Sequence, residues 1–125
     1  MIMTVSQIAL GGAIGAVARY LTGLAVLRLV GAGFPWGTLA INVIGSFLMG
    51  VLVVVLAERD AMRLAPFLMM GILGGFTTFS TFSLDTIGLI DRGEVGMAAG
   101  YVLASVVLTL GAIVLGMVMA RGVVQ

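Results

Sequence analysis

GILGGFTTFSTFS, the stretch from Gly71 to Ser83, decides what kind of fold this chain can have. It lies within an apolar segment long enough to cross a lipid bilayer. Its second half carries five hydroxyl side chains: Thr77, Thr78, Ser80, Thr81 and Ser83. Polar or irregular backbone at membrane depth is tolerated only where it is buried in protein or lines a water-filled cavity. The stretch therefore predicts a transmembrane helix that is broken beside an ion pathway or binding site.

The composition is that of a membrane protein: of 125 residues, 62% are hydrophobic and 9% charged, and the mean hydropathy is +1.30. A chain of this length predicts a single domain, residues 1–125. It contains neither cysteine nor histidine, which excludes a disulfide framework and removes the commonest proton-transfer side chain. We expect membrane lipid around it and no nucleic-acid partner, and the net charge of +1 is uninformative about nucleic acid.

Four apolar segments are each long enough to span a bilayer, and they cover residues 5–29, 37–57, 64–90 and 95–120. The short breaks between them hold most of the charged residues and leave no room for a soluble domain. The sequence thus predicts an all-α, multi-pass membrane protein with four transmembrane helices, the third of them broken in mid-span.

Small residues recur four positions apart in all four spans, a spacing that lets helix backbones approach closely. We expect close packing at Gly11/Gly15, Ser46/Gly50, Gly96/Gly100 and Ala112/Gly116. Gly71/Gly75 is assigned instead to the break. There, Gly74 and Gly75 would allow backbone geometries that alanine resists.

The arginines are divided almost evenly between the two sides of the membrane. Arg59, Arg63 and Arg121 fall on one predicted side, and Arg28 and Arg92 on the other. Orientation normally follows an excess of Lys and Arg in cytoplasmic loops. So small an excess predicts insertion in both orientations and assembly as an antiparallel homodimer. The alternative is a single orientation set by other factors.

Two polar residues in the first half of the chain lie within predicted spans. A charge such as that of Arg19 costs at least ~2.5–3.5 kcal/mol at mid-membrane. Arg19 should therefore face a cavity or a partner, unless its side chain reaches the interface, and an arginine favours an anionic substrate. Asn42 in the second span either joins two helices by hydrogen bonds or donates its amide to an anion.

The fourth span carries Tyr101, Ser105 and Thr109 at positions i, i+4 and i+8, which place them on one helix face. Such a stripe of hydroxyls predicts one wall of a narrow wet path. The alternative for Ser105 and Thr109 is that each hydroxyl bonds back to its own helix.

Phe79 and Phe82 stand among the hydroxyls of the third span. Aromatic pairs commonly pack in a core, but the positive edge of a phenyl ring can also face a small anion. Asp85 follows one turn later and is the only acid that could lie within the membrane. Its alternative position is the membrane interface.

Together these motifs resemble the Fluc (CrcB) family of small microbial fluoride channels. The resemblance rests on GGAIGAVARY in the first span, WGTLAINVIGS in the second, GGFTTFSTFS in the third and the hydroxyl stripe in the fourth. It covers essentially the whole chain.

The resemblance implies a fluoride-selective channel, not an enzyme, that gives passive export of fluoride across the inner cell membrane and so confers fluoride resistance. It also implies an antiparallel, dual-topology homodimer with two pores, and a structural Na⁺ at the dimer centre. The Na⁺ would be held by the backbone carbonyls of Gly74 and Thr77. Arg19 would be the charge in the pore vestibule. The fluoride pathway would be formed by Asn42, Phe79, Ser80, Thr81, Phe82, Tyr101, Ser105 and Thr109.

Two other classes of protein share the size of this chain. A small multidrug-type proton antiporter also has four spans, but it would need a carboxylate in the first span, where this chain has Arg19. A structural subunit of a larger membrane complex would be expected to have a third span without polar residues.

Overall fold

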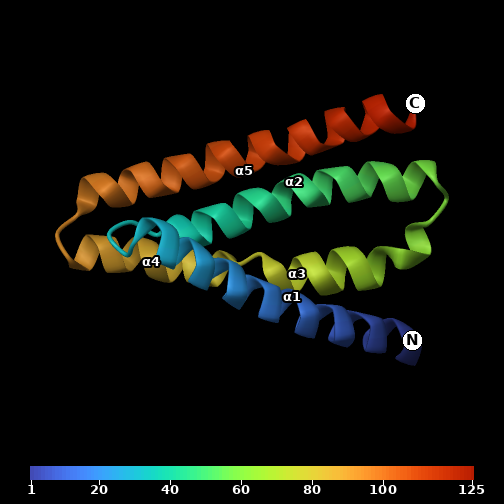
Figure 1. Cartoon of the computed structure of the whole chain (residues 1–125), viewed down its shortest axis with the longest axis horizontal. Coiled ribbons are helices and arrows are strands. Elements are labelled where there is room, and N and C mark those ends of the chain that lie inside the picture. Colours follow the sequence, from blue (N-terminus) through green and yellow to red (C-terminus); the bar gives the residue numbers. More distant parts are fainter.

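The computed structural model describes all 125 residues and consists of four long helical segments that lie side by side (Figure 1). The segments are α1 (Ile2–Val30), α2 (Trp36–Glu58), a composite third segment over Met62–Asp91, and α5 (Val95–Val124). Each is long and apolar enough to cross a membrane. The predicted all-α fold with four spans is therefore confirmed, although α1 and α5 extend beyond the predicted limits.

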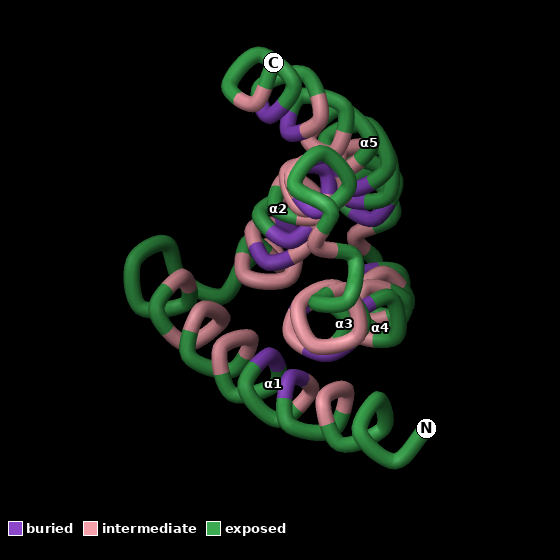
Figure 2. Tube along the Cα trace, turned by 90° about the vertical axis from the view of Figure 1, so that its right-hand side faces the viewer, coloured by how far each residue is buried: buried purple, intermediate pink, exposed green.

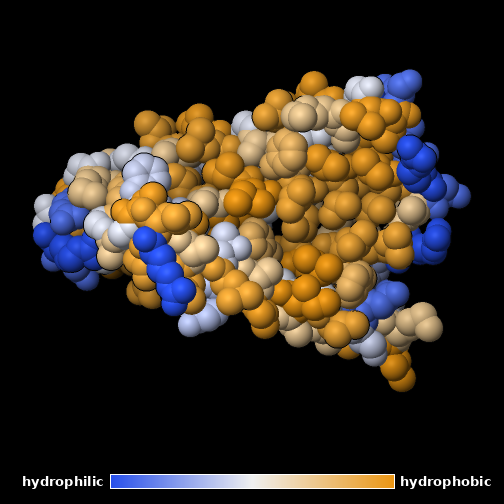
Figure 3. Space-filling model, viewed as in Figure 1, coloured by the Kyte–Doolittle hydropathy of each residue, from blue (hydrophilic) through white to orange (hydrophobic).

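The surface has the polarity of a membrane protein. Figure 3 shows apolar side chains over most of the middle of the molecule and hydrophilic side chains gathered mainly at its two ends. Residues buried within the chain lie where the helices face one another, and most of the outer surface is exposed (Figure 2). In water such a surface would drive aggregation, whereas in a bilayer it meets lipid.

The third segment is built from four pieces: η1 (Met62–Leu64), the π-helix η2 (Pro66–Leu73), α3 (Gly74–Phe76) and α4 (Phe79–Asp91). Between α3 and α4 the chain is extended, with φ/ψ of −79°/157° at Thr77 and −151°/119° at Thr78. The predicted break in mid-span is confirmed.

The sequence predicts that the adjacent glycines Gly74 and Gly75 allow the break, and this prediction is wrong. Gly74 is helical, with φ −61° and ψ −38°. The chain leaves the helix at the two threonines that follow, in an extended conformation that any residue can adopt. The conformational freedom of glycine is therefore not what breaks this helix.

The glycines before the break instead bring the third segment close to α1. A Cβ atom added to Gly71 would lie 2.9 Å from the Cα of Gly11, and one added to Gly75 would lie 2.7 Å from the carbonyl oxygen of Gly12. Our assignment of Gly71/Gly75 to the break was wrong, because this pair packs against Gly11 and Gly12 as small residues do between membrane helices.

A second close contact joins α2 and α5. A Cβ atom on Gly50 would collide with the backbone carbonyl of Ile113, and one on Gly116 with that of Phe47. Close packing is thus confirmed for these two glycines. Gly96 and Gly100 have nothing within 4 Å of an added Cβ, so this pair packs against nothing in the single chain.

The most buried side chains form a cluster at the end of the molecule where α2 and α5 begin. Tyr101 is 0% exposed and Leu89 is 1% exposed, and they pack with Leu39 and Ala98. Phe34, from the loop between α1 and α2, covers this cluster. The cluster fixes the beginnings of α2 and α5 against the end of α4, next to the polar residues described below.

Candidate functional site

The backbone at the break is held by the side-chain amide of Asn42. Its Nδ2 donates to the carbonyl oxygen of Thr78 at 3.0 Å, and the backbone N–H of Thr78 donates to its Oδ1 at 2.8 Å. One amide thus pairs with both backbone groups of a residue that lies outside any helix. An unpaired buried backbone group costs about 1–3 kcal/mol in proteins, and more in lipid, so α2 supplies what the broken helix lacks.

The threonine side chains complete the ends of the two half-helices. The Thr78 hydroxyl accepts a hydrogen bond from the N–H of Thr81 at 3.1 Å and so caps the start of α4. The backbone N–H and the hydroxyl of Thr77 each donate to the carbonyl oxygen of Leu73 at 3.0 Å.

These hydrogen bonds deprive two carbonyl groups of their regular helical donors. In a continuous α-helix, the carbonyl of Gly74 would accept from the N–H of Thr78, and that of Thr77 from the N–H of Thr81. The first of these donors is taken by Asn42 and the second by the Thr78 hydroxyl. The carbonyl oxygens of Gly74 and Thr77 are therefore available to other partners.

A cavity of about 640 Å³, which we call the vestibule, opens at the end where α2 and α5 begin. Its polar lining comes from α1, α2 and the α4 region: Arg19, Thr38, Thr78, Thr81, Asp85 and Arg92. Phe34 and Pro35 of the connecting loop also line it. The vestibule thus holds two arginines and one carboxylate, on the side of the break where α2 and α5 begin.

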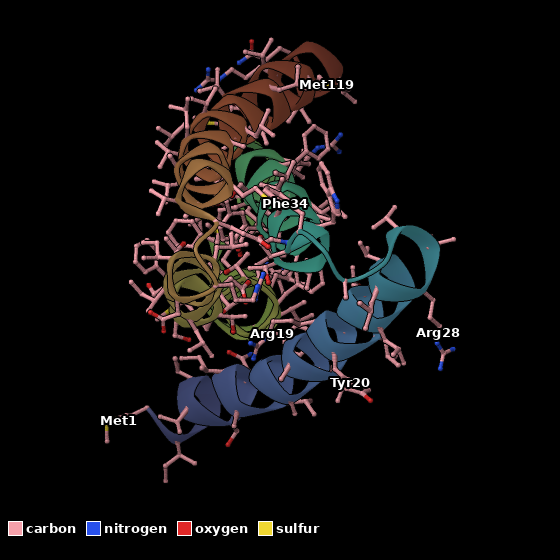
Figure 4. The ribbon with its side chains drawn as sticks, turned by 90° about the vertical axis from the view of Figure 1, so that its left-hand side faces the viewer. Met1, Arg19, Tyr20, Arg28, Phe34 and Met119 are labelled. Atoms are coloured by element: carbon pink, nitrogen blue, oxygen red, sulfur yellow. The ribbon has the colours of Figure 1, made fainter.

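Arg19 extends from α1 on the side that faces the rest of the bundle, whereas Arg28 points away from it (Figure 4). The Nε atom of Arg19 is buried and has no hydrogen-bond partner. The other vestibule arginine, Arg92, lies 3.8 Å from Glu94 in a partly exposed ion pair, which contributes little. Arg19 therefore brings a charged group into the vestibule that no protein group neutralises.

Asp85 of α4 accepts a hydrogen bond from a residue of α5. The Tyr101 hydroxyl donates to Asp85 Oδ2 at 3.1 Å. The Tyr101 ring is completely buried between Phe82, at a centroid distance of 5.1 Å, and Phe34, at 5.5 Å and nearly perpendicular. Tyr101 thus links the vestibule carboxylate to the phenylalanine pair, and it lines neither cavity itself.

A second cavity, of about 250 Å³, lies further along α2 and α5, towards the middle of these helices, and is here called the central cavity. It is lined by Asn42, Ser46, Thr77, Thr78, Phe79, Phe82, Ser105, Val106 and Thr109. Thr78 is the one residue that lines both cavities. The break in the third segment therefore stands between the vestibule and the central cavity.

Five of the eight predicted pathway residues meet in the central cavity: Asn42, Phe79, Phe82, Ser105 and Thr109. The rings of Phe79 and Phe82 lie 5.3 Å apart at 61°, an edge-to-face arrangement. Phe79 is 78% exposed in the single chain, so its outer face meets nothing within the protein.

The other three predicted pathway residues, Ser80, Thr81 and the buried Tyr101, do not line the central cavity. Ser80 is exposed, with its hydroxyl 3.4 Å from that of Thr78, and Thr81 faces the vestibule. The lining residues that sequence reasoning missed include Thr38 and Ser46 of α2. Both were detectable, since each lies four residues from Asn42 and therefore on the same face of α2.

Fold and site together define a small four-span membrane protein with polar cavities on both sides of a broken helix. A family model described as "CrcB-like protein, Camphor Resistance (CrcB)" matches residues 6–117. The chain therefore belongs to the CrcB family, and it is a multi-pass membrane protein and not an enzyme.

Several curated relatives cover almost the whole chain. One from Cereibacter sphaeroides is 59% identical over 122 residues, 98% of each chain. Relatives from Ruegeria sp. and Agrobacterium fabrum are 53% identical over 124 residues and 49% identical over 121 residues, with at least 95% of each chain covered. All three are named fluoride-specific ion channel FluC.

The pairing of Asn42 with Thr78 predicts the effect of Asn42→Asp. The carboxylate keeps the size and still accepts from the Thr78 N–H, but its second oxygen faces the Thr78 carbonyl with no proton to donate. We expect unfolding in detergent to become easier by about 1–3 kcal/mol. Thermal unfolding followed by circular dichroism measures this, with Gln7→Glu as the same chemical change at a residue of α1 that makes no side-chain hydrogen bond. An unchanged midpoint in Asn42→Asp contradicts the role given to Asn42.

Proposed function

We propose that this chain forms a fluoride-selective channel through which fluoride leaves the cell passively across the inner membrane. The observation that carries the proposal is the central cavity, where a side-chain amide, hydroxyls and two phenyl rings meet without any charged residue. The relatives named fluoride-specific ion channel FluC support the same choice of ion.

The chemistry of the central cavity suits a small, strongly hydrated anion. Removing water from fluoride is costly unless hydrogen-bond donors replace it. Asn42 uses one N–H on Thr78 and keeps a second, and Ser105 has a buried hydroxyl without a partner. The positive edges of the two phenyl rings add weak attraction, and conduction requires binding that is weak and shared among several sites.

In the proposed channel, the anion would enter the vestibule before it reaches the central cavity. Arg19 brings a positive charge without a salt-bridge partner to the vestibule, and such a charge raises the local concentration of anions. An antiporter of cationic drugs would need an acid in this position. The anion would then pass Thr78 to reach Asn42 and the phenyl pair.

This proposal predicts that the purified chain in liposomes passes fluoride and excludes chloride, measured by ion-selective electrodes. Phe82→Ile removes the ring and keeps an apolar side chain, a change that costs under ~1.5 kcal/mol where a residue only packs. We expect it to abolish most fluoride flux without unfolding the protein. Phe67→Ile, outside both cavities, is the matched control. Equal fluxes of fluoride and chloride in the wild type would overturn the proposed function.

We infer further that the functional unit is an antiparallel homodimer. Phe79 is 78% exposed, and Ser80 and Ser83 are also exposed on α4, where lipid has no use for hydroxyl groups. A second copy over this face would close the central cavity and cover these side chains. The near balance of arginines between the two sides supports opposite orientations.

The antiparallel assembly predicts the effect of biasing the orientation. Two or three lysines added at the N-terminus should fix one orientation and abolish fluoride efflux from cells. Co-expression with a copy biased the opposite way should restore efflux. Full activity from one fixed orientation, checked by accessibility of engineered cysteines, would exclude the antiparallel dimer.

A structural Na⁺ at the centre of this dimer is part of the proposal. The supporting observation is that the carbonyls of Gly74 and Thr77 have lost their regular helical donors to Asn42 and Thr78. Carbonyl oxygens suit a hard cation, and Gly74 is exposed where a second copy could approach it. When bound, the ion would hold the two broken helices together and offset the cost of desolvating an anion nearby.

The sodium proposal predicts one Na⁺ for every two chains after extensive exchange into sodium-free buffer, measured by elemental analysis of the purified protein. Asn42→Ala releases the Thr78 N–H to the Gly74 carbonyl and should lower this content, whereas Thr86→Val should not. Protein that carries fluoride but contains no sodium would contradict the ion and leave the channel function intact.

A further inference from the structure

The second helix carries a polar stripe that matches the one on α5. α2 and α5 lie side by side and run in the same direction, both beginning at the vestibule end (Figure 1). Each presents three polar side chains at i, i+4 and i+8: Thr38, Asn42 and Ser46 on α2, and Tyr101, Ser105 and Thr109 on α5. The first α2 residue lines the vestibule, and the other two line the central cavity together with Ser105 and Thr109.

Ser46 is the member of the α2 stripe whose hydroxyl has nothing to bind within the chain. Several hydroxyls in this chain bond back to the backbone carbonyl four residues before them, as Thr109 Oγ1 does to the carbonyl of Ser105 at 2.6 Å, and Thr86 Oγ1 to that of Phe82 at 2.8 Å. Ser46 makes no such bond, although it occupies a regular helical position where the same bond is available. Its O–H is free to donate into the central cavity.

Ser46 also marks where the polar part of α2 ends. Between Ser46 and Glu58 the helix carries only apolar side chains and Gly50. At Gly50 the backbones of α2 and α5 meet too closely to admit even a Cβ atom. An ion cannot continue between α2 and α5 beyond this point, so Ser46 stands at the last polar position of that wall.

We propose that Ser46 is a fluoride-pathway residue that donates its hydroxyl to the ion one helical turn beyond Asn42. One turn is about 5.4 Å, so an anion leaving the Asn42 amide would meet Ser46 from α2 and Ser105 from α5. The path through the central cavity is then lined by donors from two helices. This inference rests on the proposed function, and it concerns which residues replace the water molecules that hydrate the fluoride ion.

The test compares Ser46→Ala with Ser46→Thr by fluoride efflux from liposomes. Ser46→Ala removes a single oxygen and favours the helix, so we expect an unchanged elution volume and midpoint of unfolding. Loss of one donor is expected to slow flux about tenfold, since a hydrogen bond contributes near 1 kcal/mol or somewhat more. Ser46→Thr keeps a hydroxyl and should stay within about threefold of the wild type.

Two further variants separate failure of this inference from failure of the proposed function. Ser6→Ala makes the same change on the exposed start of α1, far from both cavities, and should leave flux unchanged. Ser105→Ala and Phe82→Ile report on the central cavity itself. If these two slow the flux and Ser46→Ala does not, Ser46 is no pathway residue. If Ser46→Thr slows flux as much as Ser46→Ala does, Ser46 acts by packing and the inference is likewise overturned. If none of the cavity variants slows the flux, the central cavity is not the path.

Discussion

The hydrogen bonds between the Asn42 amide and the backbone of Thr78 are the interaction on which this structure depends. Interrupting a transmembrane helix is costly unless most of the freed backbone groups find partners, because lipid offers none. Asn42 offers an acceptor and a donor in the spacing of a backbone group, and it pairs with both backbone groups of the extended residue Thr78. The Thr78 hydroxyl then caps α4. These two side chains replace helical hydrogen bonds that are lost at the break.

The same interaction divides the interior and exposes backbone oxygens. Thr78 lines both the vestibule and the central cavity, so the residue that Asn42 holds also stands at the boundary between them. By occupying the Thr78 N–H, Asn42 leaves the Gly74 carbonyl without its helical donor. One side chain on α2 thereby joins the break, the path and the proposed cation site. A substitution there should disturb all three at once, whereas loss of a cavity hydroxyl should disturb only the path.

Much of this arrangement could be predicted from the sequence, because it depends on local patterns. The four spans follow from apolar length, and the break follows from hydroxyls placed where lipid would reject them. The partner of Asn42 could not be predicted, since it lies 36 positions away and depends on how two helices are aligned. Nor could the roles of Gly71 and Gly75, which depend on α1 passing across them. Ser80 and Thr81 were assigned to one path, but the direction in which α4 restarts after Thr78 turns Thr81 toward the vestibule.

The placement of charge agrees with what conduction of a small anion requires. Arg19 and Arg92 lie in the vestibule together with Asp85, where water weakens the interaction of a charge with an ion and where Arg19 would only raise the local concentration of anions. The central cavity contains neutral donors and phenyl edges alone. A lysine or arginine there would bind fluoride strongly in a region of low dielectric constant and slow its release. In the proposed channel, selectivity would come from the number and position of the weak donors in this cavity.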